Sequence, residues 1–473
     1  MSSLLLVLPL FGVILSNIPL GRSLRKGLTF WPTLLGVMQV VIALFPQATW
    51  WGSWGGTSVS LPLAPADGLS QLMLLAIGLV VFASSIIAMD AIKDDRGRHN
   101  FASLLLISML GMNGVVLVKD LFSLYVFLEI VSVTSFVLIA FNLELNSFEG
   151  SFKYIVLSAI ATIMMLTSVG IFFLISGDTA FTAIAGAISL HPDNFLVQFA
   201  VLMFLCGLFI KAGSVPFHGW LPDAYSSAPA PVSMLLAGIV TKVSGVYTLI
   251  RLVHEVFGFT PKTQQILLFV GALSIVTGAL AAMGQKDFKR MLAFSSISQV
   301  GYIILSLGAG SALGVAGATF HLFNHALFKT QLFMNATAVE SQTGSRDLDS
   351  LGGLAARMPI TGTTSIIAFL SAAGIPPLAG FWSKLVIVVA LWKAGHTGYM
   401  VVAILASLLT LAYFLILQRK VFFGKVAPEC ENATEAGYLI TGPSILFALI
   451  IIAVGVLLPF LFDTIILPIR GIL

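Results

Sequence analysis

LCGLFIKAGSVPFHGWLPDA, residues 205–224, joins an apolar run typical of a membrane helix to two helix-breaking residues. The run is apolar up to Lys211, and Gly213 and Pro216 then follow within two turns. Proline removes a backbone N–H donor and clashes with the preceding turn, so we expect the helix to break here. At membrane depth such a break is tolerated only where it is buried in protein or lines a polar cavity.

The composition of the whole chain indicates a polytopic membrane protein. Hydrophobic residues make up 58% of it and charged residues only 9%, which is unlike a soluble domain. Its 473 residues allow about fourteen spans at ~20 residues each. Two cysteines are too few for a disulfide framework or a zinc ribbon, and the net charge of +4 gives no indication of nucleic-acid binding. We therefore predict an all-α polytopic membrane fold.

The apolar stretches place the spans, and the basic residues between them give an orientation. Lysine and arginine cluster after the first, third, ninth, eleventh and thirteenth spans, from Arg22 and Arg25 to Lys425, whereas the loop at 46–67 has neither. All five basic clusters then fall on one side, so the positive-inside rule places both termini outside the cytoplasm, with the chain in the cell (inner or cytoplasmic) membrane. The predicted spans lie near 4–20, 28–45, 68–90, 100–118, 121–141, 152–176, 195–213, 232–252, 264–284, 290–309, 312–338, 360–392, 398–418 and 440–462.

A second span carries a similar interruption five spans later. In SAAGIPPLAGFWSK, residues 371–384, Gly374 and the two prolines Pro376 and Pro377 precede Lys384. Paired interruptions at corresponding positions are the usual sequence clue to inverted-repeat transporters and their ion sites. The pair therefore indicates an internal repeat.

A few ionisable side chains lie inside the predicted spans. Such groups cost a few kcal/mol to insert and usually face a bundle interior or a water-filled cavity. Three of them are four residues apart, roughly one helical turn, and so line one face. Because histidine and desolvated lysine both exchange protons near neutral pH, this stripe predicts a proton path. The full set is Glu129, Lys211, Lys242, His321, His325, Lys329 and Lys384.

Simpler interpretations exist for each of these residues. Glu129 alone would serve as a static partner for a base, Lys211 would snorkel toward the interface, and a single histidine would be a packing residue. Two further candidates are His218, inside the first break, and Lys153, near the start of the sixth span. An interfacial position with a solvated or structural role is expected for Asp223, Arg251, Lys119 and Asp120.

Metal and covalent chemistry find little support. His321 and His325 have the spacing of an HExxH zinc motif, but Leu322 occupies the glutamate position and no third ligand is evident. The chain has no phosphate-binding loop, GxSxG elbow or CxxC pair. We expect no metal, cofactor, redox or hydrolytic centre in this chain.

Four longer motifs resemble the antiporter-like membrane subunits shared by respiratory complex I, Mrp-type cation/proton antiporters, membrane-bound hydrogenases and formate hydrogenlyases. The resemblance covers roughly 70–425. The motifs are KAGSVPFHGWLPDAYSSAPAPVSMLLAG (211–238), QKDFKRMLAFSSISQVGY (285–302), FHLFNHALFKTQLF (320–333) and AGIPPLAGFWSKL (373–385). One departure is Gln331, where an aliphatic residue is more usual.

The resemblance implies a division of the chain and a role for each buried charge. Fourteen helices would contain two inverted five-helix repeats, with the broken helices seventh and twelfth. Glu129 would pair with Lys211, Lys242 would continue a central axis, the histidine stripe would relay protons, and Lys384 would exchange the ion with the outer side. The division is 1–95 for the first three helices, 96–256 and 257–425 for the repeats, and 426–473 for the last helix.

The implied function is translocation of H⁺ or Na⁺ by a subunit of a redox-driven membrane complex. The segment 338–359 looks most like the hydrogenase and formate-hydrogenlyase branch or Mrp D-type subunits. A peripheral redox arm would then supply the energy, and its subunits would carry iron–sulfur clusters and nickel–iron. Two alternatives are a subunit of an Mrp-type Na⁺/H⁺ antiporter without a redox partner, and a scaffold or coupling subunit that moves no ion.

Overall fold

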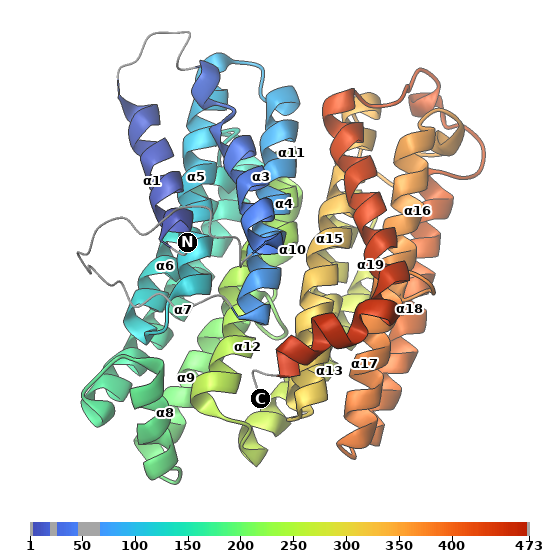
Figure 1. Ribbon diagram of the computed structural model, residues 1–473. Coiled ribbons are helices and arrows are strands. Elements are labelled where there is room, and N and C mark those ends of the chain that lie inside the picture. The colour runs from blue at the N-terminus through green and yellow to red at the C-terminus, as the bar shows by residue number, and fades with distance from the viewer. Residues whose placement is uncertain (1–2, 19–25, 46–66, 471–473) are drawn as a thin grey trace.

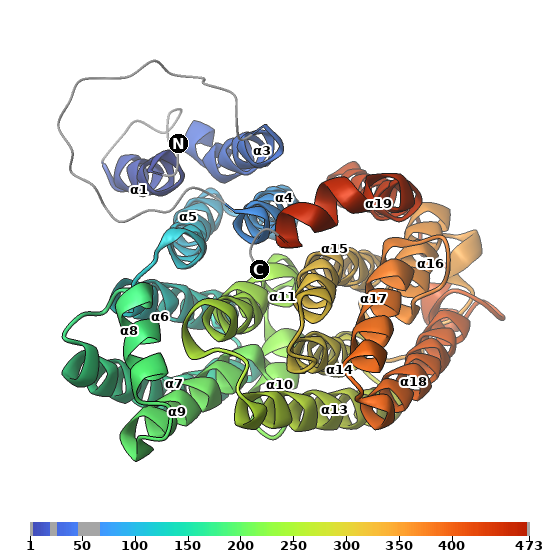
Figure 2. The same cartoon turned by 60° about the horizontal axis from the view of Figure 1, so that its bottom comes forward.

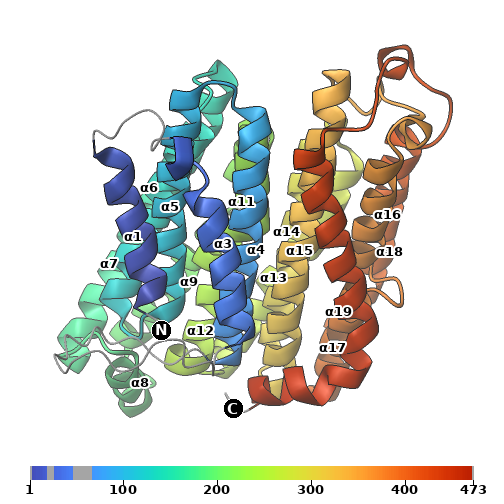
Figure 3. The ribbon, with the colours of Figure 1, turned by 45° about the horizontal axis from the view of Figure 1, so that its top comes forward.

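Long apolar helices run side by side through the part of the chain that the structure describes, residues 3–18, 26–45 and 67–470 of a computed structural model (Figure 1). Among these residues, 11 helices are long and apolar enough to cross a membrane. The shorter α1, the more polar α15 and the interrupted pair α16 and α17 run along them (Figures 1 and 3). With these three segments the bundle reaches the predicted fourteen, and the all-α polytopic fold is confirmed.

The helix boundaries differ from the predicted ones by a few residues in most spans. The sixth span begins at Leu145 rather than near 152, the eighth continues to Phe257 rather than 252, and α8 is a short helix that the apolar pattern did not indicate. The helices are α1 Leu4–Asn17, α3 Trp31–Leu44, α4 Gly68–Ala91, α5 Asp95–Leu117, α6 Leu121–Ile139, α7 Leu145–Ser176, α8 Phe181–Leu190, α9 Phe195–Ala212, α10 Trp220–Ser227, α11 Ala230–Leu235, η1 Leu236–Val240, η2 Lys242–Tyr247, α12 Thr248–Leu252, η3 Val253–Phe257, α13 Pro261–Met283, α14 Phe288–Gly308, α15 Ala312–Thr343, η4 Leu354–Ala356, α16 Pro359–Ala373, α17 Ala379–Lys393, α18 Thr397–Val421, η5 Pro428–Cys430 and α19 Tyr438–Arg470.

The view along the bundle shows α15 between two groups of helices (Figure 2). On one side lie α6, α7 and α9, and on the other α16, α17 and α18, while α1 and α3 pack at the edge against α5 and α4. The side chains of α15 are buried from Gly314 to Val339. A helix buried all round is expected to be apolar, so the histidines, lysine and amides on α15 are unusual at this position.

Both predicted helix breaks are present. α9 ends at Ala212, and Gly213 adopts φ +64° before α10 begins at Trp220. α16 ends at Ala373, and Gly374 adopts φ +85° before α17 begins. Left-handed backbone at a helix C-terminus favours glycine, because a Cβ atom would be strained there. The Gly and Pro signals in the sequence therefore mark real interruptions.

Two short backbone pairings have the same pattern in the two halves of the chain. Asp120, which caps α6, bridges to Ala180, and Asp287, which caps α14, bridges to Asp347. In each aspartate, Oδ1 accepts a hydrogen bond from a backbone N–H in the first helical turn, 2.7 Å in one case and 2.8 Å in the other. This likeness agrees with an internal repeat. The inverted repeats and the four-part division of the chain stay predictions.

The basic loops in the described part of the chain gather at one end of the bundle. A cavity of about 330 Å³ at that end is lined by residues from several connections, among them Asp90, Asn146, Lys289 and Arg346. Lys286 and Lys420 both pair there with Asp349. Among the predicted markers, Arg22, Arg25 and nearly all of the loop at 46–67 lie outside the described residues. We call this the basic end.

Gly245 sets the distance between η2 and α9. A Cβ atom at this position would lie 2.4 Å from both N and Cα of Ala212, the residue after Lys211. We expect Gly245→Ala to force the two helices apart and to destabilise the protein by about 1–3 kcal/mol. Thermal unfolding in detergent measures this. Gly170→Ala is the matched control, because a Cβ there meets nothing within 4 Å; equal melting temperatures for the two variants would contradict the expectation.

Candidate functional site

Glu129 on α6 and Lys211 on α9 form an ion pair, although 82 residues separate them. Lys211 Nζ lies 3.0 Å from Glu129 Oε1. The ammonium also donates to Ser132 Oγ at 2.6 Å and to Ser158 Oγ at 2.7 Å, so its three protons have three oxygen acceptors. Thr162 Oγ1 donates to the same carboxylate oxygen at 2.7 Å. The lysine is therefore held as a charged group inside the bundle.

The break in the seventh span positions this lysine. Lys211 lies in the last turn of α9, where the carbonyl ends of the helix favour a positive charge. Trp220 Nε1, at the start of α10, donates to the Ile210 carbonyl oxygen at 3.0 Å and so ties the two half-helices together. Lys211 has no exposed surface. Snorkelling toward the interface therefore does not describe this side chain.

Lys242 lies on the next helix, at the first residue of η2. The residues around it, η1 and η2, form π-type turns, which occur mostly at functional sites. Its Nζ donates to the Ala237 carbonyl oxygen and lies 3.5 Å from Thr241 Oγ1. The side chain is completely buried, and η2 packs against both α9 and α15.

The predicted stripe on α15 is buried along its whole length. The rings of His321 and His325 are nearly parallel, with centroids 6.3 Å apart. His321 Nδ1 lies 2.8 Å from Ser383 Oγ on α17. Lys329 Nζ donates to the Leu292 carbonyl oxygen at 2.9 Å and contacts Ser295 Oγ, both on α14. Within the described residues, His321 Nε2 and both His325 ring nitrogens have no hydrogen-bond partner in the protein.

Lys384 on α17 lies beside the second break. Its Nζ is 3.4 Å from the Ala373 carbonyl oxygen at the end of α16 and 4.6 Å from the centre of the Tyr302 ring. It is 5% exposed, so it too does not snorkel. The helices α9, η2, α15 and α17 pack successively against one another. They bring together six bases, which we call the buried base row: Lys211, Lys242, His321, His325, Lys329 and Lys384.

The two weaker candidates lie outside this row. Lys153 is partly exposed and forms ion pairs with Glu149 and Asp223, each at 2.6 Å. Its contacts are those of a rim residue. His218 is half-buried in the connection between α9 and α10, and its Nδ1 has no partner among the described residues.

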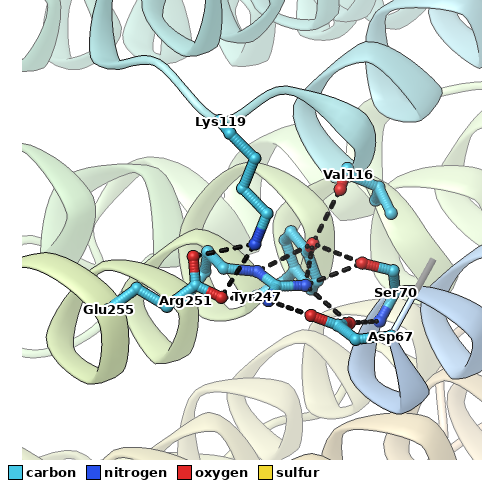
Figure 4. A network of polar contacts seen from close by, with 7 residues as sticks. All are labelled: Asp67, Ser70, Val116, Lys119, Tyr247, Arg251 and Glu255. Atoms are coloured by element: carbon cyan, nitrogen blue, oxygen red, sulfur yellow. Dashed lines mark hydrogen bonds and ion pairs between the residues drawn. The ribbon is translucent and has the colours of Figure 1, made fainter. Parts of the chain in front are cut away.

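The structure corrects the interfacial placement expected for Arg251 (Figure 4). Its side chain is 4% exposed and donates to Ser70 Oγ at 2.7 Å and to Asp67 Oδ1 at 2.9 Å. It also pairs with Glu255 at 2.5 Å, which in turn accepts from Lys119 at 2.8 Å. The predicted eighth span ended one residue after Arg251, whereas the helix continues to Phe257 and keeps the arginine inside. The i, i+4 spacing of Arg251 and Glu255 is the one sequence signal that pointed to this cluster.

Metal coordination finds no constellation in the part of the chain that the structure describes: no group of three or more His, Cys, Asp and Glu side chains is close enough to hold an ion. The chemistry available to the buried base row is proton exchange along a line of lysine and histidine side chains, with one carboxylate at its end.

Comparisons with known proteins agree with this arrangement. The family profile described as "NADH:quinone oxidoreductase/Mrp antiporter, TM" matches residues 118–426. NADH-quinone oxidoreductase subunit N of Desulforudis audaxviator is 36% identical over 368 residues, 77% of this chain and 72% of that protein. One Na⁺/H⁺ antiporter subunit of Alkalihalophilus pseudofirmus is 36% identical over 419 residues, 82% of this chain but 51% of that protein, so the chain spans about half of its length.

A solved structure resembles the whole chain. One chain of the membrane-bound sulfane sulfur reductase, an archaeal respiratory membrane complex, superposes with a TM-score of 0.86 and 29% identity, covering 100% of this chain and 97% of that one. The match of the family profile covers more than half of the chain, and the relative from Desulforudis exceeds 30% identity over most of both sequences. The chain therefore belongs to the NADH:quinone oxidoreductase/Mrp antiporter family, as a multi-pass, antiporter-like membrane subunit.

Proposed function

We propose that this chain moves H⁺ or Na⁺ across the cell membrane through the buried base row. The observation that carries the proposal is the ion pair between Glu129 and Lys211, at 3.0 Å, at one end of a row of six bases that have almost no exposed surface. Charged groups at membrane depth are costly and mark ion pathways. A scaffold that moves no ion would gain nothing from keeping them.

The ion pair acts as a switch in this proposal. While Glu129 and two hydroxyls surround the Lys211 ammonium, its charge is compensated. An uncompensated ammonium in an apolar interior is unfavourable, so movement of the carboxylate favours loss of the proton toward Lys242. From there the histidines and Lys329 on α15 pass the charge to Lys384. The energy must come from outside the chain, because its described residues provide hydrogen-bonding groups and bases but no reaction that releases energy.

The subunit works in this proposal within a multisubunit membrane complex with a peripheral redox arm. The similarity to a subunit N of NADH-quinone oxidoreductase and to the sulfane sulfur reductase supports a redox-driven complex. The segment 338–359 supports the hydrogenase and formate-hydrogenlyase branch, whose partner subunits would hold iron–sulfur clusters and nickel–iron. Both termini lie outside the cytoplasm in this arrangement, and the basic end faces inward.

A second candidate is a subunit of an Mrp-type Na⁺/H⁺ antiporter. The 36% identity to the antiporter protein of Alkalihalophilus favours it to the same degree as the identity to subunit N of the oxidoreductase favours the first. This candidate needs no redox partner, because an ion gradient drives the exchange. The two candidates therefore differ in what is bound to the chain.

Purification from native membranes in mild detergent tests the choice. We expect the band that contains this chain to include iron–sulfur or nickel-containing subunits, identified by mass spectrometry and metal analysis. A band made of small membrane subunits alone, with Na⁺/H⁺ exchange activity after reconstitution, would favour the antiporter. Solubilisation in two detergents of different harshness shows whether a peripheral arm was lost during the preparation.

A further inference from the structure

A second polar stripe runs along α15 on a different face from the histidine stripe. It consists of Asn324, Gln331 and Asn335, spaced by seven and four residues, so that the three amides share one face of the helix. Gln331 is two positions from Lys329, which turns it about 200° away from the histidine stripe. All three amides are buried, with at most 1% of their surface exposed. The stripe therefore does not belong to the buried base row.

Each of these amides is held at one end and unpartnered at the other. Asn324 Nδ2 donates to the Ala379 carbonyl oxygen at 2.9 Å, and Gln331 Nε2 donates to Asn335 Oδ1 at 3.0 Å. Asn324 Oδ1, Gln331 Oε1 and Asn335 Nδ2 have no partner in the protein, each with under 1 Å² of exposed area. Buried polar atoms are costly without a hydrogen bond, and water commonly supplies it. Three such atoms on one face point to a hydrated line.

One end of the stripe reaches the surface at the basic end. Asn335 Oδ1 accepts from Thr364 Oγ1 at 3.1 Å, and Thr364 in turn donates to the Thr361 carbonyl oxygen at 3.2 Å. Thr361 Oγ1 donates to Glu435 Oε1 at 2.6 Å, and Glu435 is partly exposed. These contacts lie where α15, α16 and α19 pack together (Figures 1 and 3). Polar groups thus lead from a surface carboxylate to the middle of α15.

The other end of the stripe reaches the second helix break. Asn324 binds the carbonyl oxygen of Ala379, the first residue of α17, and Lys384 lies between this point and the Ala373 carbonyl oxygen at the end of α16. Between Gln331 and Asn324 the helix rises by roughly 10 Å, a distance that a few waters would bridge. Broken helices at membrane depth line polar cavities.

We propose that Asn324, Gln331 and Asn335 line a hydrated half-path from the Glu435 rim at the basic end to the break beside Lys384. The proposal rests on the proposed function, because the half-path gives the last lysine of the buried base row contact with water on the basic side. The amides are positioning residues: they order water and do not themselves carry the proton. Gln331, which replaces an aliphatic residue at this position, is the residue that joins Asn335 to the deeper part of the stripe.

Cysteine accessibility in the assembled complex tests the half-path. The background chain carries Cys206→Ala and Cys430→Ala, and the probe is the membrane-impermeant reagent methanethiosulfonate-ethyltrimethylammonium, applied to membrane vesicles of either orientation. We expect Asn335→Cys to react at least about tenfold faster from the basic side than from the other side, because water reaches it only there. Ala336→Cys is the matched control, at the same depth but on another face and 2% exposed in the native chain.

Equal reaction rates for the two cysteines, or reaction of Asn335→Cys from the opposite side, would overturn the half-path. Transport gives a second measurement: Gln331→Leu is expected to lower ion uptake by about threefold or more, whereas Gln331→Asn keeps most of it. Lys211→Met separates the two proposals. If that variant keeps full transport while Asn335→Cys reacts, the proposed function fails and the half-path stands; if it stops transport and Asn335→Cys stays unreactive, the half-path alone fails.

Discussion

Replacing Lys211 with methionine is expected to stop ion transport by the assembled complex. Methionine fills nearly the same volume but cannot hold a proton, so the first base of the row is lost and Glu129 loses its partner at 3.0 Å. We expect transport to fall by at least about tenfold, equivalent to about 1.4 kcal/mol or more in the barrier. Proton uptake into proteoliposomes that contain the purified complex, driven by its own partner reaction, measures the effect.

Two matched variants give this measurement its meaning. Lys153→Met removes a lysine of the same size that pairs with Glu149 and Asp223 at the rim, and it is expected to keep most of the transport. Lys211→Arg keeps a charge opposite Glu129 but not an amine that releases its proton readily, so it is expected to assemble and yet transport poorly. Full transport in Lys211→Met would remove the buried base row from the pathway and leave the scaffold interpretation.

The helix breaks were predictable from the sequence because they follow local rules. Gly213 and Pro216 lie within a few residues of each other, as do Gly374 and Pro376, and each pair acts on its own backbone. The burial of Lys211 and Lys384 also followed from local reasoning, since both lie deep within long apolar runs. The partner of Lys211, by contrast, came from the family resemblance, because no local pattern connects positions 82 residues apart.

Arg251 and the amide stripe show what local patterns miss. Arg251 lies near the end of an apolar run, where an interfacial position is the ordinary expectation, and its partner Asp67 is 184 residues away. The seven- and four-residue spacing of Asn324, Gln331 and Asn335 was readable, but a search for ionisable groups passes over neutral amides. Their importance becomes visible only from the unpartnered atoms and from the contact with Thr364.

Replacing Arg251 with methionine is expected to produce the largest loss of stability in the chain. The guanidinium joins the start of α4 to the end of the eighth span, through Asp67 and Ser70 on one side and Tyr247 and Glu255 on the other (Figure 4). Removing one member of a buried ion pair leaves the other charge uncompensated, which costs about 3–5 kcal/mol. The melting temperature in detergent measures the loss, with exposed Arg357→Met as the control.

The remaining carboxylates differ in what they lose. Glu255 keeps Lys119, whose Nζ lies 2.8 Å from both of its oxygens. Asp67 loses the guanidinium that compensates its charge, so the double variant Arg251→Met, Asp67→Asn is expected to recover part of the lost stability, by about 0.5–3 kcal/mol. A double variant no more stable than Arg251→Met would contradict the pairing as the source of the effect.

The pH dependence gives an independent check on the same contact. Burial raises the pKa of the Asp67 carboxyl, but the hydrogen bonds and charge of Arg251 outweigh burial and lower the pKa from 3.8 to about 2. A carboxyl with a lowered pKa in the folded state stabilises that state above its unfolded pKa and loses this contribution as the pH falls through the folded value. The difference in melting temperature between the native chain and Arg251→Met is therefore expected to be largest above about pH 4 and to shrink as the pH approaches about 2. A difference that stays constant over this range would mean that Arg251 stabilises the fold by packing rather than through its charge on Asp67.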